Sequence, residues 1–179
     1  MIKLHLGCGK KDFGPDWTHI DGGEFSHLHS HDITKIPFDD NTVDLIYASH
    51  VFEYFDREEA TVVLEEWRRA LKPGGILRLA VPDFKKMVQL YISDHSLNEF
   101  LGPLFGKMKM GNETIYHKTV YDYNSLDIKL SLNGFKNIKL WEWKEVDHGT
   151  FDDYSQAYIP HMDKENGVLI SLNIEGTKI

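Results

Sequence analysis

The sequence contains a single cysteine, Cys8, among 179 residues. One cysteine cannot form an intrachain disulfide, and this favours a reducing compartment. No apolar run approaches the roughly 20 residues that span a bilayer, and residues 1–6 have the length of a strand and lack the apolar centre of a signal peptide. We therefore expect a soluble, cytoplasmic protein with no membrane partner.

Basic residues are also scarce, because 20 Lys and Arg stand against 28 Asp and Glu, for a formal net charge of -8. Nucleic-acid affinity depends on cationic neutralisation of phosphates, so this charge argues against DNA or RNA as a partner. The sequence has no internal repeat and no low-complexity tract. With 41% hydrophobic residues, a chain of this length predicts one globular domain over residues 1–179.

The pattern of apolar residues predicts strands that alternate with helices in the first half of the chain. Asp56 and Glu59 have the spacing of a capping box, and the helix that follows should end at Pro73-Gly74-Gly75. These features predict an α/β fold with a mainly parallel sheet, and two late strands without a helix between them predict an antiparallel edge. The first expected strand ends at Leu6, and the others cover 17–21, 43–48, 76–81, 135–143 and 168–174, with a short extended piece at 27–33. Further helices are expected over 84–92 and from Ser125 to Leu132, and a loop is expected over 102–111.

In an open parallel sheet, ligands bind at the carboxyl ends of the strands. The first such end is Gly7-Cys8-Gly9, where two missing β-carbons let the backbone approach a ligand. The second carries Asp21, which is placed to accept hydrogen bonds from a ribose diol. A pyrophosphate site is not expected, because Lys10 to Asp12 replace the third glycine of a dinucleotide fingerprint and the run to Asp21 is too short for a full helix. A tight turn without function is the alternative for this loop.

Several motifs follow the glycine loop in a fixed order, and together they resemble the class I methyltransferases, in particular the small methyltransferases akin to the methyltransferase type 11 group. The resemblance covers about the first 83 residues, with weaker support from His117 and from Asn133-Gly134-Phe135. It implies a Rossmann-like methyltransferase fold with a mainly parallel seven-stranded sheet, an antiparallel edge strand and helices on both faces. It also implies S-adenosyl-L-methionine as cofactor and methyl transfer as the reaction. The motifs are 4–9 (LHLGCG), 18–21 (THID), 31–33 (HDI), 37–53 (PFDDNTVDLIYASHVFE), 69–75 (RALKPGG) and 81–83 (VPD).

The same resemblance implies roles for individual residues. The glycine loop would approach the methionine and ribose parts of the cofactor, and the end of the second strand would bind the ribose hydroxyls. An aspartate and an isoleucine after the third strand would meet the adenine, and the end of the fourth strand would lie near the sulfonium. The expected cofactor-binding residues are Gly7, Cys8, Gly9, Asp21, Gly22, Asp32, Ile33, Ser49 and His50; the expected catalytic residues are His117, which is the preferred base, His50 and Glu53.

Simpler roles remain open for several of these residues. Asp32 could be a turn residue, Ser49 a helix cap and His50 a half-buried structural histidine. Tyr54 departs from the family pattern, because many relatives carry histidine there, and this weakens the case for a histidine base at that point. His27, His29 and His31 alternate along an extended segment and could ligate zinc, but no second ligand cluster is apparent, so we expect no metal.

The methyl acceptor is less well indicated, and a small molecule or a glycan is expected. Trp141, Trp143, Tyr154 and Tyr158 would suit stacking on sugars, although such aromatics are more often core residues. Residues 84–124 are the expected insertion that covers the substrate. Cover for the cofactor is expected from that segment, from residues 144–166 or from a second subunit in a homodimer. The alternatives to an enzyme of this kind are a non-catalytic S-adenosylmethionine- or nucleotide-binding protein and a zinc metallohydrolase.

Overall fold

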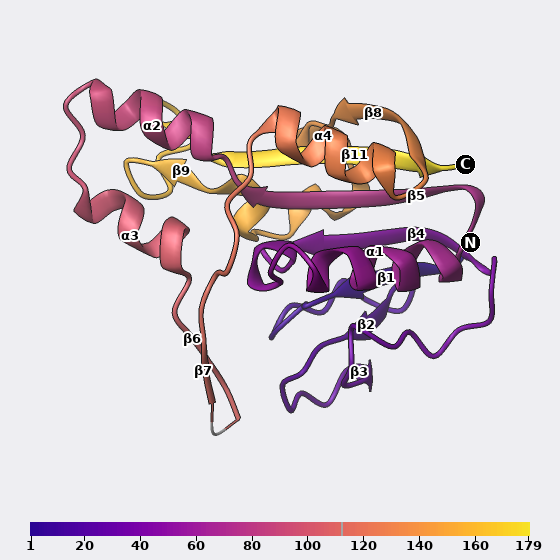
Figure 1. The fold of residues 1–179 in the computed structure, drawn as a ribbon. Helices are drawn as coiled ribbons and strands as arrows, with labels where there is room; N and C mark the ends of the chain where they lie inside the picture. The colour runs from indigo at the N-terminus through magenta and orange to yellow at the C-terminus, as the bar shows by residue number, and fades with distance from the viewer. Residues whose placement is uncertain (112) are drawn as a thin grey trace.

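The computed structural model describes residues 1–111 and 113–179, in which seven strands form one sheet in the order β3-β2-β1-β4-β5-β11-β8 (Figure 1). The five strands from β3 to β5 are parallel to one another, and β11 runs antiparallel to both of its neighbours. The strands are β1 (Lys3–Leu6), β2 (Thr18–Ile20), β3 (Leu28–Ser30), β4 (Val43–Ser49), β5 (Leu71–Pro82), β8 (Phe135–Leu140) and β11 (Ser171–Lys178).

This topology confirms the predicted mainly parallel, seven-stranded sheet. The antiparallel strand lies one position inside the edge, because β8 pairs with its outer side. The predicted strand at 168–174 is two strands in the structure. β10 (Val168–Leu169) pairs with β9 (Tyr158–Ile159), and β11 begins only at Ser171.

Two other strand boundaries differ from the predicted ones. β5 begins at Leu71 because that residue pairs with Val43 before the register shifts, so the Pro73-Gly74-Gly75 turn lies within the strand. β8 ends at Leu140, and Trp143 begins a short 3₁₀ helix, η2 (Trp143–Glu145). The predicted strand ends are wrong here because the prediction relies on the positions of Gly, Pro and aromatic residues. Cross-strand pairing sets the ends instead.

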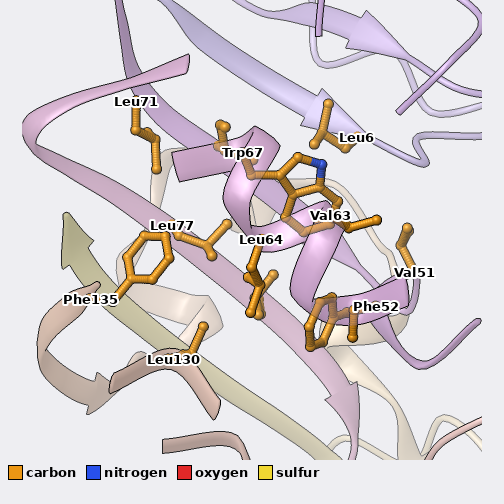
Figure 2. Packing of buried hydrophobic residues seen from close by; sticks show 14 of the residues in the cluster. Leu6, Val51, Phe52, Val63, Leu64, Trp67, Leu71, Leu77, Leu130 and Phe135 are labelled. Carbon is orange, nitrogen blue, oxygen red and sulfur yellow. The ribbon is translucent and has the colours of Figure 1, made fainter. Parts of the chain in front are cut away.

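The helix α1 (Glu59–Ala70) packs on one face of the sheet. Its capping box is present, because Glu59 N–H donates to Asp56 Oδ1 and Asp56 N–H donates to Glu59 Oε2, both at 2.9 Å. Leu64 and Trp67 are fully buried and lie in one cluster with Leu6 and Leu77 (Figure 2). Burial of side chains of this size, at about 1.5–3 kcal/mol each, anchors the helix beside the strand ends.

The helix α4 (Tyr123–Leu132) lies on the same face. Its N-cap is Asp122, not the predicted Ser125, which is the third helical residue and completes a capping box with the Asp122 backbone. Leu126 and Leu130 are buried in the same cluster as Phe135. The misplaced cap arose because Asp and Ser are both good caps, and only the backbone geometry distinguishes them.

The opposite face of the sheet is covered by aromatic side chains and short 3₁₀ helices. Residues 7–17 contain no helix, and instead Phe13 and Trp17 pack with Tyr47 and Trp141. The predicted helices on both faces of the sheet are therefore α-helices on one face and short 3₁₀ helices on the other. The buried Trp141, whose indole N–H donates to Leu79 O, is a core residue and not a sugar-stacking one. The 3₁₀ helices here are η2, η3 (Asp147–Thr150) and η4 (Tyr154–Gln156).

Two helices and a strand pair project beyond the carboxyl ends of the parallel strands (Figure 1). The predicted helix at 84–92 is present as α2 (Phe84–Ile92), and β6 (Met108–Met110) pairs with β7 (Glu113–Ile115). The predicted loop at 102–111 is wrong, because α3 (Asn98–Phe105) and β6 occupy most of it. Phe100 and Leu104 of α3 pack against Met87 and Leu90 of α2, and this packing outweighs the helix-breaking Gly102 and Pro103.

Candidate functional site

The glycine loop after β1 holds Gly7 and Gly9 in a left-handed backbone conformation. Gly7 has φ +65°, and a β-carbon there would overlap the side chain of Val51. Gly9 has φ +54°, and no atom of the described residues lies within 4 Å of the place where its β-carbon would be. Both positions favour glycine, and the open side of Gly9 leaves its backbone accessible to a ligand.

Asp21 connects the loops that follow β1 and β2. Its carboxylate accepts hydrogen bonds from Gly9 N–H at 2.8 Å and from Gly23 N–H at 2.7 Å. Each oxygen keeps one further lone pair that a ribose hydroxyl could use. The strand β6 reaches this point as well, because a β-carbon on Gly22 would lie 3.0 Å from Met110 Sδ. The projecting segment, which consists of α2, α3, β6 and β7, therefore lies with β6 over the end of β2.

Cys8 and the nearby histidines do not form a reactive or metal-binding group. Burial raises the pKa of the Cys8 thiol to about 12, and its Sγ lies 3.7 Å from His27 Nε2. His31 contacts Gly23 O at 2.9 Å, and the ring of His29 faces Phe38. The part of the chain that the structure describes holds no group of three or more His, Cys, Asp or Glu placed to bind a metal ion. The alternating histidines therefore have separate local partners.

Asp32 and Ile33 follow β3, close to the end of β2. Asp32 Oδ1 accepts hydrogen bonds from Thr34 N–H at 2.8 Å and from Thr34 Oγ1 at 2.6 Å, and the hydroxyl bond in particular lowers the pKa of Asp32. These contacts make Asp32 a turn residue, while its second oxygen faces no such partner in the described residues. The carbonyl of Ile33 accepts the Trp67 indole N–H, which fixes this loop to α1.

The most unusual group in the molecule lies at the end of β4, where Glu53 stands between two histidines. Glu53 Oε1 lies 3.5 Å from His50 Nδ1 and 3.6 Å from His117 Nε2. The Glu53 side chain is 1% exposed, and neither of its oxygens has a hydrogen-bond partner among the described residues. Burial raises the pKa of Glu53 to about 8 and lowers that of His50 to about 3. The structure thus brings together the three residues that the sequence suggested for catalysis.

Hydrogen bonds around this cluster determine which ring nitrogens carry protons. His117 Nδ1 lies 2.9 Å from Pro103 O, a pure acceptor, so Nδ1 carries the hydrogen and Nε2 presents a lone pair to Glu53. Ser171 Oγ donates to Asn173 Oδ1 at 2.8 Å, and it therefore accepts from His50 Nε2 at 3.3 Å. His50 Nδ1 then also presents a lone pair to Glu53. Two acceptors that face one carboxyl group favour the protonated form of Glu53, which is the direction of its raised pKa.

The segment that carries His117 is fixed by backbone hydrogen bonds. Lys118 N–H and Thr119 N–H both donate to Glu53 O, at 2.9 and 3.2 Å, and His117 N–H donates to Phe105 O at 2.9 Å. These bonds hold the projecting segment against the residues after β4. Sequence reasoning missed Ser171, which orients His50, because it is distant in the sequence and no local motif marks it. Tyr154 was expected only as an aromatic that would suit stacking on sugars, and its ring lies 5.4 Å from that of His50.

His50 and Ser49 show two further features of a ligand site. His50 has φ 52°, a left-handed conformation that is uncommon for non-glycine residues and is concentrated at functional sites. The buried Ser49 Oγ has no hydrogen-bond partner within the described ranges. With the open face of Gly9 and the free lone pairs of Asp21, these groups fit a polar ligand that lies across the ends of β1, β2 and β4.

Gly106, the C-cap of α3, allows His117 to reach Glu53. It has φ 50°, and a β-carbon there would overlap the His117 ring. We expect Gly106→Ala to destabilise the fold by roughly 2 kcal/mol, through left-handed strain and displacement of His117. Gly102→Ala is the control, because its β-carbon would meet no atom of the described chain within 4 Å and alanine gains up to about 1 kcal/mol in a helix. Urea unfolding measures both, and equal effects would contradict the role assigned to Gly106.

Comparisons with known proteins show what the chain is similar to. Residues 10–79 match the family described as "Methyltransferase domain". The demethylmenaquinone methyltransferase of Staphylococcus carnosus is 29% identical over 61% of this chain and 47% of its own length, and that of Staphylococcus haemolyticus is 29% identical over 64% and 49%. The chain thus spans about half the length of these relatives.

Solved structures show the same fold at lower sequence identity. An S-adenosylmethionine-dependent methyltransferase from Archaeoglobus fulgidus has a TM-score of 0.60 and 16% identity over 98% of this chain and 85% of its own. One from Methanosarcina mazei has a TM-score of 0.57 and 15% identity over 99% and 92%. The chain therefore has the fold of the class I S-adenosylmethionine-dependent methyltransferases, and the resemblance found in its motifs is confirmed. S-adenosyl-L-methionine is the cofactor of that class.

None of the helices described in residues 1–111 and 113–179 is long and apolar enough to cross a bilayer.

Proposed function

We propose that this protein transfers a methyl group from S-adenosyl-L-methionine to a small-molecule acceptor whose reacting atom carries a proton. The observation that carries the proposal is the buried Glu53 carboxyl group between the lone pairs of His50 and His117, at the strand end next to the glycine loop. A pKa near 8 suits a general base at neutral pH, because a base works best when its pKa is close to the working pH.

The cofactor would be held by the residues at the ends of β1 to β4. The Gly7-Cys8-Gly9 backbone and Asp21 with Gly22 would take the methionine and ribose parts, and Asp32 with Ile33 would border the adenine. Ser49 and His50 would lie near the sulfonium, which supplies an electrophilic methyl group. The protein would hold the acceptor in line with that methyl group, which is the main source of rate in such a displacement.

The cluster at Glu53 would take up the acceptor's proton. The ionised carboxylate of Glu53 is the form that accepts this proton. His50 and His117 are positioning residues, because their ring-nitrogen lone pairs face the carboxyl group and orient the proton once Glu53 carries it. This assignment moves the base from His117, which the sequence favoured, to Glu53, because the His117 Nε2 lone pair, its proton-accepting position, is directed at Glu53 and is not open to an acceptor. Segment 84–124, which includes residue 112 outside the described part, would cover the acceptor through α2, α3 and β6.

The nature of the acceptor follows from the relatives and from the buried aromatics. The staphylococcal relatives are named demethylmenaquinone methyltransferases, which favours a small molecule over a glycan. Trp141 lies in the core and is not available for a sugar, whereas Tyr154 is 66% exposed beside His50 and could contact an acceptor ring. We therefore assign a small organic acceptor to this site.

Ligand binding separates the proposal from its rivals. A thermal-shift series with S-adenosylhomocysteine, ATP, NAD and zinc should show stabilisation by S-adenosylhomocysteine alone, of roughly 2.7 kcal/mol at a hundredfold excess over its dissociation constant. Stabilisation by ATP or NAD would indicate a nucleotide-binding protein, and stabilisation by zinc a metallohydrolase. Either result, without a response to S-adenosylhomocysteine, would contradict the proposal.

Asp21 should dominate cofactor affinity. Asp21→Ala removes the acceptor for the ribose and frees Gly9 N–H and Gly23 N–H, so we expect S-adenosylhomocysteine to bind roughly 10- to 100-fold more weakly, as for the loss of charge-assisted hydrogen bonds. Isothermal titration calorimetry measures the change. Asp16→Ala, at an exposed position of the preceding loop, is the matched control. An unchanged affinity in Asp21→Ala would place the cofactor elsewhere.

A further inference from the structure

The helices α2 and α3, which lie at the far end of the sheet in Figure 1, line an apolar groove. The groove has a volume of about 160 Å³, and its walls consist only of apolar and aromatic side chains. Val88 is 38% exposed, and Tyr91 and Leu97 are each 55% exposed. A concave apolar surface that is open to solvent is typical of a ligand site. Phe84, Val88 and Tyr91 line it from α2, and Leu97, Phe100 and Leu104 line it from the other side.

This groove continues toward the Glu53 cluster. Leu104 also lines a second hollow, of about 260 Å³, whose wall includes His117 and Thr119. His117 in turn lies 3.6 Å from Glu53. At Leu104 the surface therefore changes from a purely apolar groove to a hollow whose wall includes the polar side chains of His117 and Thr119.

We propose that the methyl acceptor is an amphiphile, with an apolar chain in the α2–α3 groove and a polar reactive head in the hollow at His117. This inference rests on the proposed methyl transfer and names the substrate class of that site. A small polar acceptor has no use for the groove, whereas an apolar chain buries its surface there and fixes the head beside the base. Each buried methylene strengthens binding about fourfold, the equivalent of about 0.8 kcal/mol.

Straight-chain alkanols with six to twelve carbons are suitable probes, because their heads are small and uncharged. Isothermal titration calorimetry should show affinity that rises about fourfold per methylene and then levels off once the groove is filled. The longest alkanol should bind with and without saturating S-adenosylhomocysteine, since the groove lies apart from the glycine loop. Affinity that does not depend on chain length, or mutual exclusion of the two ligands, would overturn the inference.

Matched variants on both sides of the groove locate the binding site. Val88→Gln and Leu97→Gln place an amide in the groove and should weaken dodecanol binding at least tenfold. Ile92→Gln is the control, because Ile92 is 78% exposed on α2 but does not line the groove. Equal weakening by Ile92→Gln would indicate a flat membrane- or protein-docking face instead. A dimer in sedimentation equilibrium that Val88→Gln dissociates would assign the groove to a second copy of the chain, and would also overturn the inference.

Parallel titration with S-adenosylhomocysteine keeps the two proposals distinguishable. Val88→Gln should bind S-adenosylhomocysteine as the parent protein does, which also shows that the variant is folded. If the parent binds S-adenosylhomocysteine but no alkanol, the amphiphilic acceptor is wrong and the methyltransferase assignment stands. If it binds alkanols but no S-adenosylhomocysteine, the methyltransferase assignment fails, and with it the acceptor role of the groove.

Discussion

Glu53→Gln is expected to stabilise the protein by roughly 3 kcal/mol at pH 7, because the native fold holds a carboxyl group that ionises easily once unfolded. The pKa is about 8 in the fold and 4.5 as the ordinary value. The folded state therefore binds more protons between these two values. The contribution of Glu53 to the free energy of unfolding is fully present below pH 4.5 and is lost as the pH rises through 8. A glutamine avoids this loss, and its NH₂ group offers one hydrogen to each of the two facing histidine nitrogens.

The measurement is urea unfolding of both proteins from pH 5 to pH 8.5. The advantage of the variant should grow from roughly 1 kcal/mol at pH 5 to more than 4 kcal/mol at pH 8.5. Glu65→Gln, at an exposed position of α1, is the control and should show no such trend. A variant that is less stable than the parent, or an advantage that does not depend on pH, would show that Glu53 is ionised in the fold. Stabilisation by loss of a functional group is a feature of active sites, where function has a cost in stability.

The buried histidine on the other face of the sheet should make the protein sensitive to acid. Burial, with Arg78 close by, lowers the pKa of His148 to about 3 from its ordinary 6.5. The unfolded state binds more protons between these values. The contribution of His148 to the free energy of unfolding is therefore fully present above pH 6.5 and is lost as the pH falls toward 3. Between pH 7 and pH 5 this one residue removes about 2 kcal/mol, and His50 should remove a similar amount.

The free energy of unfolding in urea should therefore fall by about 2 kcal/mol less in His148→Gln than in the parent when the pH is lowered from 7 to 5. His161→Gln, at an exposed position, is the control and should lose as much as the parent. The variant gives up stacking of the ring on Phe13 and Tyr47, so its stability at pH 7 is lower, and only the difference between the two pH values tests the idea. An unchanged difference would mean that His148 is already protonated in the fold.

The sequence could predict that the proposed cofactor-binding residues lie close together, because they follow strand ends. The carboxyl ends of neighbouring parallel strands meet at one edge, and therefore Gly9 and Asp21 could be expected to lie together, as their 2.8 Å hydrogen bond shows. His50 and Glu53 follow β4 directly. His117 could be expected only on the same side of the sheet, and the bonds of Lys118 and Thr119 to Glu53 O that fix its position arise from tertiary packing.

Other features could not be read from local patterns. The orientation of the His50 ring depends on Ser171 and Asn173, which come from a strand more than a hundred residues later. The aromatic layer of Phe13, Trp17 and Tyr47 replaces helices that the short segment after Gly9 has no room to form. The helix α3 exists because its apolar side chains pack on α2, although its own sequence contains Gly102 and Pro103.

Turnover with methyl-labelled S-adenosylmethionine tests the central claim most directly. The parent protein and Glu53→Gln are incubated with the small-molecule fraction of a cell extract, and transfer of label and release of S-adenosylhomocysteine are followed from pH 6 to pH 9.5. The account predicts acceptor-dependent transfer by the parent, with a rate that rises through a pKa near 8. Glu53→Gln should bind S-adenosylhomocysteine equally well and transfer at least a hundredfold more slowly. Equal rates for the two proteins, or cofactor binding by the parent without any transfer, would contradict it.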